Sequence, residues 1–181
     1  LKGTSIEPFS EFVHFGLTSQ DINNTAVPFS MQLGIDEVII PTIKDILEKI
    51  TAFGDEWKNI PLLSRTHGQA ATPTTVGKEF AVFAERLRIQ LETLINTPMS
   101  AKFGGATGAF NAHRLAFPEV NWPEFGNQLV NDLGLVRSYP TTQIDHYDQL
   151  AAVFDALRRI NVILMDFAKD IWQYISMDFF K

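Results

Sequence analysis

Residues 143–176 read QIDHYDQLAAVFDALRRINVILMDFAKDIWQYIS, and this stretch decides the fold class. Apolar side chains recur in it at alternating intervals of three and four residues, at Leu150, Val153, Leu157, Ile160, Leu164, Phe167, Ile171 and Tyr174. This alternation predicts one long helix that buries a continuous seam against other helices. Further apolar side chains lie outside the seam, at Val162, Ile163, Met165 and Trp172. We therefore expect more than one neighbour to cover this helix.

Two other segments have helical periodicity. The first has apolar residues at Ile39, Ile43, Ile46, Ile50 and Phe53. There we expect Pro41 to kink the helix and Gly54 to be its C-cap. The second runs from about Thr74 to Asn96, with a stripe at Val76, Phe80, Phe83, Leu87, Leu91 and Leu94. Between it and residue 143 we predict loops and one short helix from Pro123 to Leu133. No strand pattern of convincing length occurs, so we predict an all-α bundle of long helices.

Composition excludes several classes of function. The 181 residues are 45% apolar, which is enough for one core, and their net charge of −6 is spread along the chain. That charge argues against nucleic-acid binding. With no cysteine and four scattered histidines, we expect no metal site. No signal peptide is visible and charges interrupt the apolar C-terminal stretch, so we expect no membrane span and a cytoplasmic protein.

One histidine, His67, lies in the segment Ser64-Arg65-Thr66-His67-Gly68-Gln69, which is extended and bounded by glycine and proline. An imidazole held between two helices can transfer protons near neutral pH. The neighbouring arginine, threonine and glutamine supply donors for an anionic substrate. Taken alone, a loop histidine is more often structural, so both interpretations stay open at this point.

A second motif, HFGLTSQDINN, covers residues 14–24. Thr18 and Asp21 have the spacing of a capping box at a helix start. The same geometry suits a bound carboxylate or phosphate, because a helix N-terminus offers free amides. Gln143 follows two threonines at the expected start of the third helix, where capping is again the alternative to ligand binding.

A glycine pair and two histidines carry weaker signals. Lys102 and the turn at Gly104-Gly105 could cradle a phosphate, or the turn could simply need positive φ. His113 and His146 belong to no motif, and we assign them structural roles.

Both motifs resemble those of the fumarase/aspartase superfamily, and Gly68 after His67 resembles its adenylosuccinate lyase branch. The resemblance covers most of the chain. It implies anti β-elimination of fumarate from adenylosuccinate, giving AMP, and from the succinylated aminoimidazole carboxamide ribotide of purine biosynthesis, without a cofactor. It also implies that His67 is the general acid that protonates the departing nitrogen.

The resemblance further implies which residues contact the small-molecule substrate. Thr18, Ser19 and Gln143 match substrate-binding positions of the family. Thr66 and His14 are candidates for the same site, and a buried or capping role is the alternative for His14. A homotetramer with a shared helical core is implied too, which agrees with a third helix that needs several neighbours.

The family's serine-bearing loop, whose serine takes the proton from carbon, has no counterpart before Lys181. The family's N-terminal phosphate-binding region has none either. We therefore expect residues 1–181 to be the central helical domain of a longer chain, and to be inactive alone. The alternatives are another superfamily lyase, such as argininosuccinate lyase or fumarase, and a noncatalytic helical oligomerisation module. Gly68 and the Thr141-Thr142-Gln143 element favour the purine enzyme.

Overall fold

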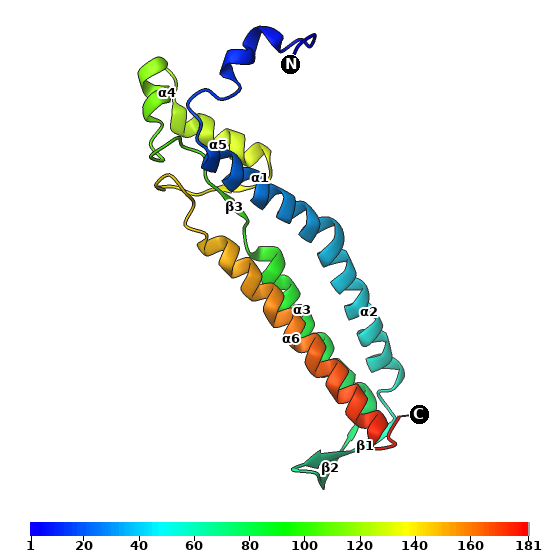
Figure 1. The fold of residues 1–181 in the computed structure, drawn as a ribbon. Coiled ribbons are helices and arrows are strands. Elements are labelled where there is room, and N and C mark those ends of the chain that lie inside the picture. Colours follow the sequence, from blue (N-terminus) through cyan, green and yellow to red (C-terminus); the bar gives the residue numbers. More distant parts are fainter. Residues whose placement is uncertain (181) are drawn as a thin grey trace. The chain divides into compact units, whose positions relative to one another are not determined.

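The computed structural model describes residues 1–180, which divide into two compact units. Unit 1 comprises Leu1–Gly34 and Pro98–Ala151, and unit 2 comprises Ile35–Thr97 and the chain from Ala152 onward. Helices dominate both units (Figure 1), so the all-α prediction is confirmed. Within residues 1–180, none of the helices combines the length and the apolar character that crossing a membrane requires.

Unit 1 consists of short elements around an aromatic core. Its elements are η1 (Glu7–Phe12), α1 (Ser19–Gly34), β3 (Ser100–Ala101), α4 (Asn111–Ala116), α5 (Trp122–Asp132), β4 (Val136–Arg137) and the first turn of α6 (Asp148–Ser176). The two short strands pair in parallel. The predicted helix from Pro123 to Leu133 is confirmed as α5, whereas α4 was not expected. Phe110 is fully buried and lies against the rings of His113 and Trp122.

Unit 2 consists of three long helices and a β-hairpin. Its elements are the π-helical turn η2 (Ile35–Ile39), α2 (Ile40–Glu56), β1 (Pro61–Thr66), β2 (Gln69–Thr75), α3 (Val76–Asn96) and the rest of α6. Every residue of the stripe predicted for α3 is buried. The seam of α6 packs against it, because Phe167 lies 5.4 Å from the ring of Phe80 and 5.2 Å from that of Phe83. The long-helix prediction is therefore confirmed for this unit.

Gly54 does not end α2, so that expectation was wrong. The helix continues to Glu56, and Gly54 is buried inside it. A Cβ atom at Gly77 of α3 would overlap the carbonyl oxygen of Gly54. The two glycines therefore let α2 and α3 approach closely, which is a packing role and not a capping one. The helical backbone also continues across Pro41, through the π-helical turn that precedes α2.

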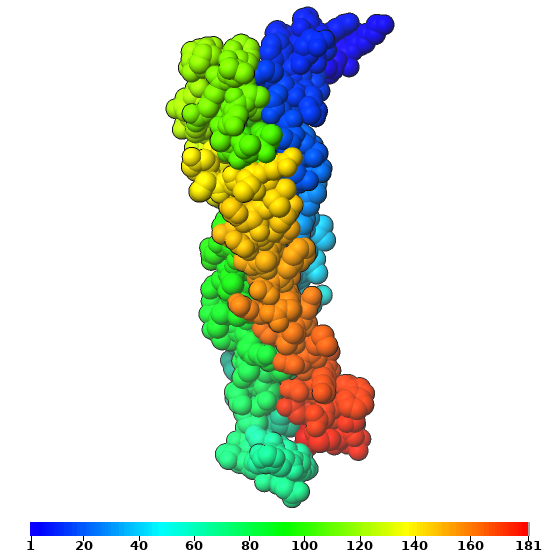
Figure 2. Space-filling view, turned by 60° about the vertical axis from the view of Figure 1, so that its left-hand side comes forward, coloured from blue at the N-terminus to red at the C-terminus, as the bar shows by residue number. Residues whose placement is uncertain are grey.

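The segment between α2 and α3 is a β-hairpin, which the sequence did not predict. β1 and β2 pair antiparallel, with Leu63 opposite Pro73 and an irregularity between Leu63 and Arg65. PLLSRT and QAATPTT show no clean alternation of apolar and polar residues, because most of the hairpin is exposed on both faces. Figure 2 shows it as the turquoise projection at the end of α3.

Candidate functional site

The start of α1 has the predicted capping box. The amide of Thr18 donates to Asp21 Oδ2 at 2.8 Å, and the amide of Gln20 donates to Thr18 Oγ1 at 3.2 Å. Ser19, the first residue of the helix, is exposed. Since the Thr18 hydroxyl accepts from Gln20, it keeps its own hydrogen to donate elsewhere.

Asp21 also anchors the glycine-rich loop, through a fully buried ion pair. Its Oδ1 atom accepts from Lys102 Nζ at 2.7 Å and from the amides of Gly104 and Gly105 at 2.9 and 3.0 Å. Both charged side chains are 0% exposed. Burial by itself would raise the pKa of Asp21, but these donors and the Thr18 amide hold it below its usual value.

Lys102 and the Gly104-Gly105 turn therefore do not form a phosphate cradle. The carboxylate of Asp21 already occupies the turn amides, and Lys102 Nζ makes its second bond to the carbonyl of Gly105 at 2.6 Å. The alternative that the turn needs positive φ fits Gly105, whose φ is +76°. No local sequence pattern signals the ion pair, because its members lie 81 residues apart.

The same loop touches the segment that carries Gln143. Gly108 has a φ of +77°, and a Cβ atom there would overlap the carbonyl oxygen of Thr141. Unit 1 thus brings together the chain segments of Thr18, Ser19 and Gln143, with the glycine-rich loop between them. This convergence of three chain segments is the candidate site of unit 1.

Gln143 is not at the start of the third helix, contrary to expectation. It lies exposed in the loop before α6, which begins at Asp148. The loop backbone is occupied by other contacts: the amide of Asp145 donates to Asn24 Oδ1 at 3.0 Å, and that of Tyr147 to Asp145 Oδ2 at 3.1 Å. Thr141 and Thr142 therefore lie too far from the helix start in sequence to cap it.

The two histidines of unit 1 near α1 differ in environment. His14 is exposed, so a buried role is excluded for it. His113 is 2% exposed, and its Nδ1 has no hydrogen-bond partner among the described residues. Burial lowers the pKa of His113, and the charge of Asp21 opposes this only partly. His113 is thus a neutral core imidazole that packs against the Gly16 backbone, as its structural assignment predicted.

His67 and Thr66 lie in unit 2, at the tip of the hairpin. Thr66 pairs with Gln69, so His67 and Gly68 are the two turn residues, with φ of +49° and +74°. Such a two-residue turn needs positive φ at both positions, which glycine adopts freely and histidine tolerates. Arg65 Nη1 donates to the carbonyl of Gly68 at 3.0 Å and closes the turn. The His67 side chain is exposed.

A polar cavity of about 390 Å³ lies beside this turn. Among its lining residues are Arg65, His67, Glu79, Asp170 and Tyr174. The Tyr174 hydroxyl donates to Glu79 Oε2 at 3.4 Å. Burial and the neighbouring carboxylates raise the pKa of Tyr174 to about 12, and burial also raises that of Asp170. Sequence reasoning missed this cavity, although a charged Asp170 beside the apolar seam was a signal for it.

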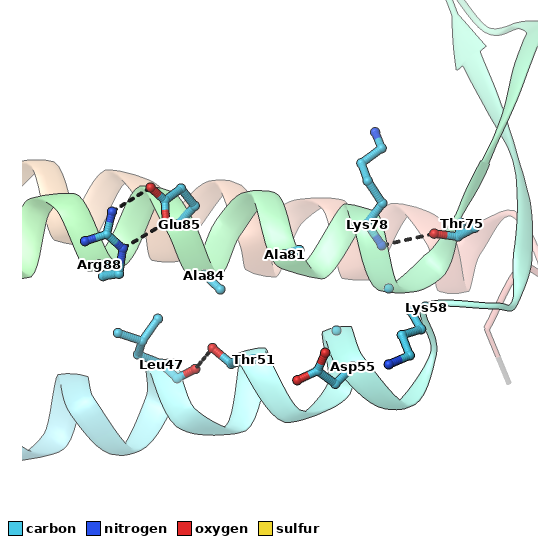
Figure 3. Close-up of a pocket in the computed structure, with 12 residues that line it drawn as sticks. Leu47, Thr51, Asp55, Lys58, Thr75, Lys78, Ala81, Ala84, Glu85 and Arg88 are labelled. Atoms are coloured by element: carbon cyan, nitrogen blue, oxygen red, sulfur yellow. Dashed lines mark hydrogen bonds and ion pairs between the residues drawn. The ribbon is translucent and has the colours of Figure 1, made fainter.

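A second hollow of unit 2 contains none of the predicted site residues. It is a groove between α2 and α3, shown in Figure 3, beside the Gly54 and Gly77 contact. Among the charged residues that line this groove, Arg88 forms ion pairs with Glu85 and Glu92, and Asp55 is exposed to solvent. We therefore place no candidate site there. Over residues 1–180, the acidic, histidine and cysteine side chains form no cluster of three or more that could hold a metal ion.

Comparison with known proteins adds independent information. A family described as lyase matches residues 3–181. The chain is 53% identical, over 97% of its length, to adenylosuccinate lyase of Dictyostelium discoideum. It is 44% identical, over 95% of its length, to the adenylosuccinate lyases of Haemophilus influenzae and Escherichia coli K12. The chain spans 38% of the length of each of these relatives. Because the family match covers almost every residue, the chain belongs to the lyase family.

Proposed function

We propose that the protein to which this chain belongs is an adenylosuccinate lyase of purine biosynthesis. It eliminates fumarate from adenylosuccinate to give AMP, and from the succinylated aminoimidazole carboxamide ribotide. The observation that carries the proposal is the similarity to adenylosuccinate lyases over 97% of the chain, which includes both motifs. The reaction needs no cofactor, since acid and base side chains suffice for it.

We propose that His67 performs the acid step, as the resemblance of its motif implies. A β-elimination needs a base that takes a proton from the carbon beside a carboxylate, and an acid that protonates the departing nitrogen. The exposed imidazole at the hairpin tip supports the acid role, because a substrate can reach it. We propose that the base, a serine, lies outside residues 1–181, so that this chain alone is the central helical domain and is inactive.

Substrate binding is assigned to Thr18, Ser19, Gln143, Thr66 and His14. Four of these side chains are exposed and the fifth, Thr18, is partly exposed. The first turn of α1 adds the partial positive charge of a helix N-terminus, which suits the carboxylates of a succinyl group. The Thr18 hydroxyl can donate to such a carboxylate without breaking its bond to Gln20.

We also propose that the protein is a cytoplasmic homotetramer with α6 in the shared core. Three apolar side chains outside the seam of α6 support this assembly: Val162, Met165 and Trp172 are 47%, 71% and 68% exposed. Large apolar side chains gathered on one helix favour contact with another subunit over contact with water. Ile163, the fourth apolar side chain outside the seam, is buried within unit 2.

Steady-state kinetics of the full-length protein test the site. We expect His67→Asn, a substitution that the positive φ of this turn tolerates, to lower kcat by roughly 10² to 10⁴, the usual contribution of a general acid, with the fold intact. Thr18→Ala and Gln143→Ala should mainly raise KM. Thr42→Ala, on the exposed side of α2, is the matched control and should change neither constant. Near-normal kcat in His67→Asn would contradict the acid assignment, and turnover by residues 1–181 alone would contradict the proposal that the base lies outside them.

A further inference from the structure

One buried amide side chain on α1, Asn24, connects three segments of unit 1. Asn24 is 4% exposed. Its Oδ1 accepts from the Asp145 amide at 3.0 Å, and its Nδ2 donates to the Tyr147 hydroxyl at 2.8 Å. Its own carbonyl accepts from the Lys102 amide at 3.1 Å. Both ends of the side-chain amide are therefore committed to the loop that precedes α6.

That loop depends on such support. Residues 138–147 contain no helix or strand, and they connect β4 to α6. Tyr147 has a φ of +63°, a strained conformation that a residue with a side chain of this size keeps only where its surroundings impose it. Asn24 binds the end of the loop at Asp145 and Tyr147, which follow Gln143 by two and four residues. Asn24 therefore fixes the backbone that presents Gln143.

The local charges explain why this position holds an amide. Asp145 is 5% exposed, and its Oδ1 has no hydrogen-bond partner among the described residues. Asp21, also buried, lies one helical turn before Asn24 on the same face of α1. A carboxylate at position 24 would add a charge and could only accept hydrogen bonds, whereas an uncharged amide accepts from the Asp145 amide and donates to the Tyr147 hydroxyl.

We propose that Asn24 is a positioning residue that holds the Gln143 loop in the conformation that binds substrate. Asp21 and Asn24, on one face of α1, then each hold a different loop in place. Asp21 fixes the glycine-rich loop through Gly104 and Gly105, and Asn24 fixes the loop of Gln143. The catalytic meaning of the proposal rests on the proposed function, in which Gln143 contacts the substrate.

The test combines kinetics with amide hydrogen exchange on the full-length protein. Asn24→Ala should raise KM about tenfold, in line with the loss of about one net hydrogen bond, and change kcat less than threefold. Because Gln143→Ala removes the group that Asn24 positions, the double variant should bind no more weakly than Gln143→Ala alone. The Asp145 amide should lose at least tenfold protection in Asn24→Ala.

Two further variants make the result specific. Asn23→Ala changes the same residue type one position earlier, at an exposed site, and should leave KM and Asp145 exchange unchanged. Tyr147→Phe removes only the hydroxyl that Asn24 binds, so it should fold even where Asn24→Ala does not, and should raise KM two- to fivefold.

The outcomes separate the inference from the function on which it rests. If Gln143→Ala leaves KM unchanged, the substrate-binding assignment fails, and the exchange of the Asp145 amide still decides whether Asn24 holds the loop. If Gln143→Ala raises KM while Asn24→Ala and Tyr147→Phe both behave like Asn23→Ala, the positioning role is overturned. An additive double variant would overturn it as well.

Discussion

The buried pair of Asp21 and Lys102 allows a quantitative prediction for Lys102→Met. Methionine fills a similar volume without the charge, so the change removes the 2.7 Å ion pair and the bond to Gly105. Removing one partner of a buried pair costs about 3–5 kcal/mol, because the other charge stays buried. Asp21 keeps three amide donors, from Thr18, Gly104 and Gly105. We therefore expect the lower end of that range, about 3 kcal/mol.

Urea unfolding at pH 7 measures this cost. With a slope of about 2 kcal/mol per M, a loss of about 3 kcal/mol lowers the midpoint by about 1.5 M. The cost should shrink toward pH 4, since Asp21 without its lysine takes up a proton more readily and a neutral carboxyl needs no partner. The stability of the parent chain changes with pH in the opposite direction. The lowered pKa of Asp21 stabilises the parent fold above about pH 4, and this stabilisation is lost as pH falls through that pKa.

Two comparisons make the prediction refutable. Lys2→Met removes an exposed lysine of the same unit and should change the free energy of unfolding by less than about 0.5 kcal/mol. The double variant Asp21→Asn with Lys102→Met should lose less than the sum of its single variants, because no charge remains unpaired. A parent-like midpoint for Lys102→Met at pH 7, or strictly additive losses, would show that the pair does not hold unit 1 together.

Three further predictions concern other residues. Replacing His113 by leucine should flatten the pH dependence of the free energy of unfolding below about pH 6.5, measured by urea unfolding at several pH values. In the parent chain the buried imidazole stays neutral, so this free energy falls there by up to about 1.4 kcal/mol per pH unit. Gly77→Ala should destabilise the chain by about 1–3 kcal/mol through overlap with Gly54, whereas Gly34→Ala, with open space around it, should be neutral or stabilising in thermal unfolding. Trp172→Glu should dissociate the proposed tetramer in sedimentation experiments while leaving helicity unchanged, because this side chain is 68% exposed within one chain.

Elements whose stability comes from their own periodicity could be predicted from the sequence. The stripe of α3 and the seam of α6 repeat at helical spacing, and both proved buried or partly buried. The capping box of Thr18 and Asp21 is local too, since its partners lie three residues apart. Such features depend on neighbours along the chain, so one sequence is enough to reveal them.

Features that depend on distant partners were missed. The pairs Asp21–Lys102 and Asn24–Asp145 join residues 81 and 121 positions apart. No periodicity links such positions, so the delayed start of α6 could not be predicted. Gly54 shows the same limit, because a glycine near a helix end resembles a cap until its contact with Gly77 is known. The hairpin was not predicted because its strands are stabilised by pairing with each other and not by an apolar face.

The left-handed turn at the hairpin tip restricts which amino acids evolution or engineering can place there. The backbone at position 67 has a φ of +49°, which disfavours most residue types whatever their chemical role. Only glycine, asparagine, aspartate and histidine adopt such a backbone conformation readily. Histidine alone among these four titrates near neutral pH. Asparagine is thus the substitution that removes the proton but keeps the turn, whereas alanine alters both. Proton transfer near neutral pH is therefore compatible with only one residue type at this position, histidine.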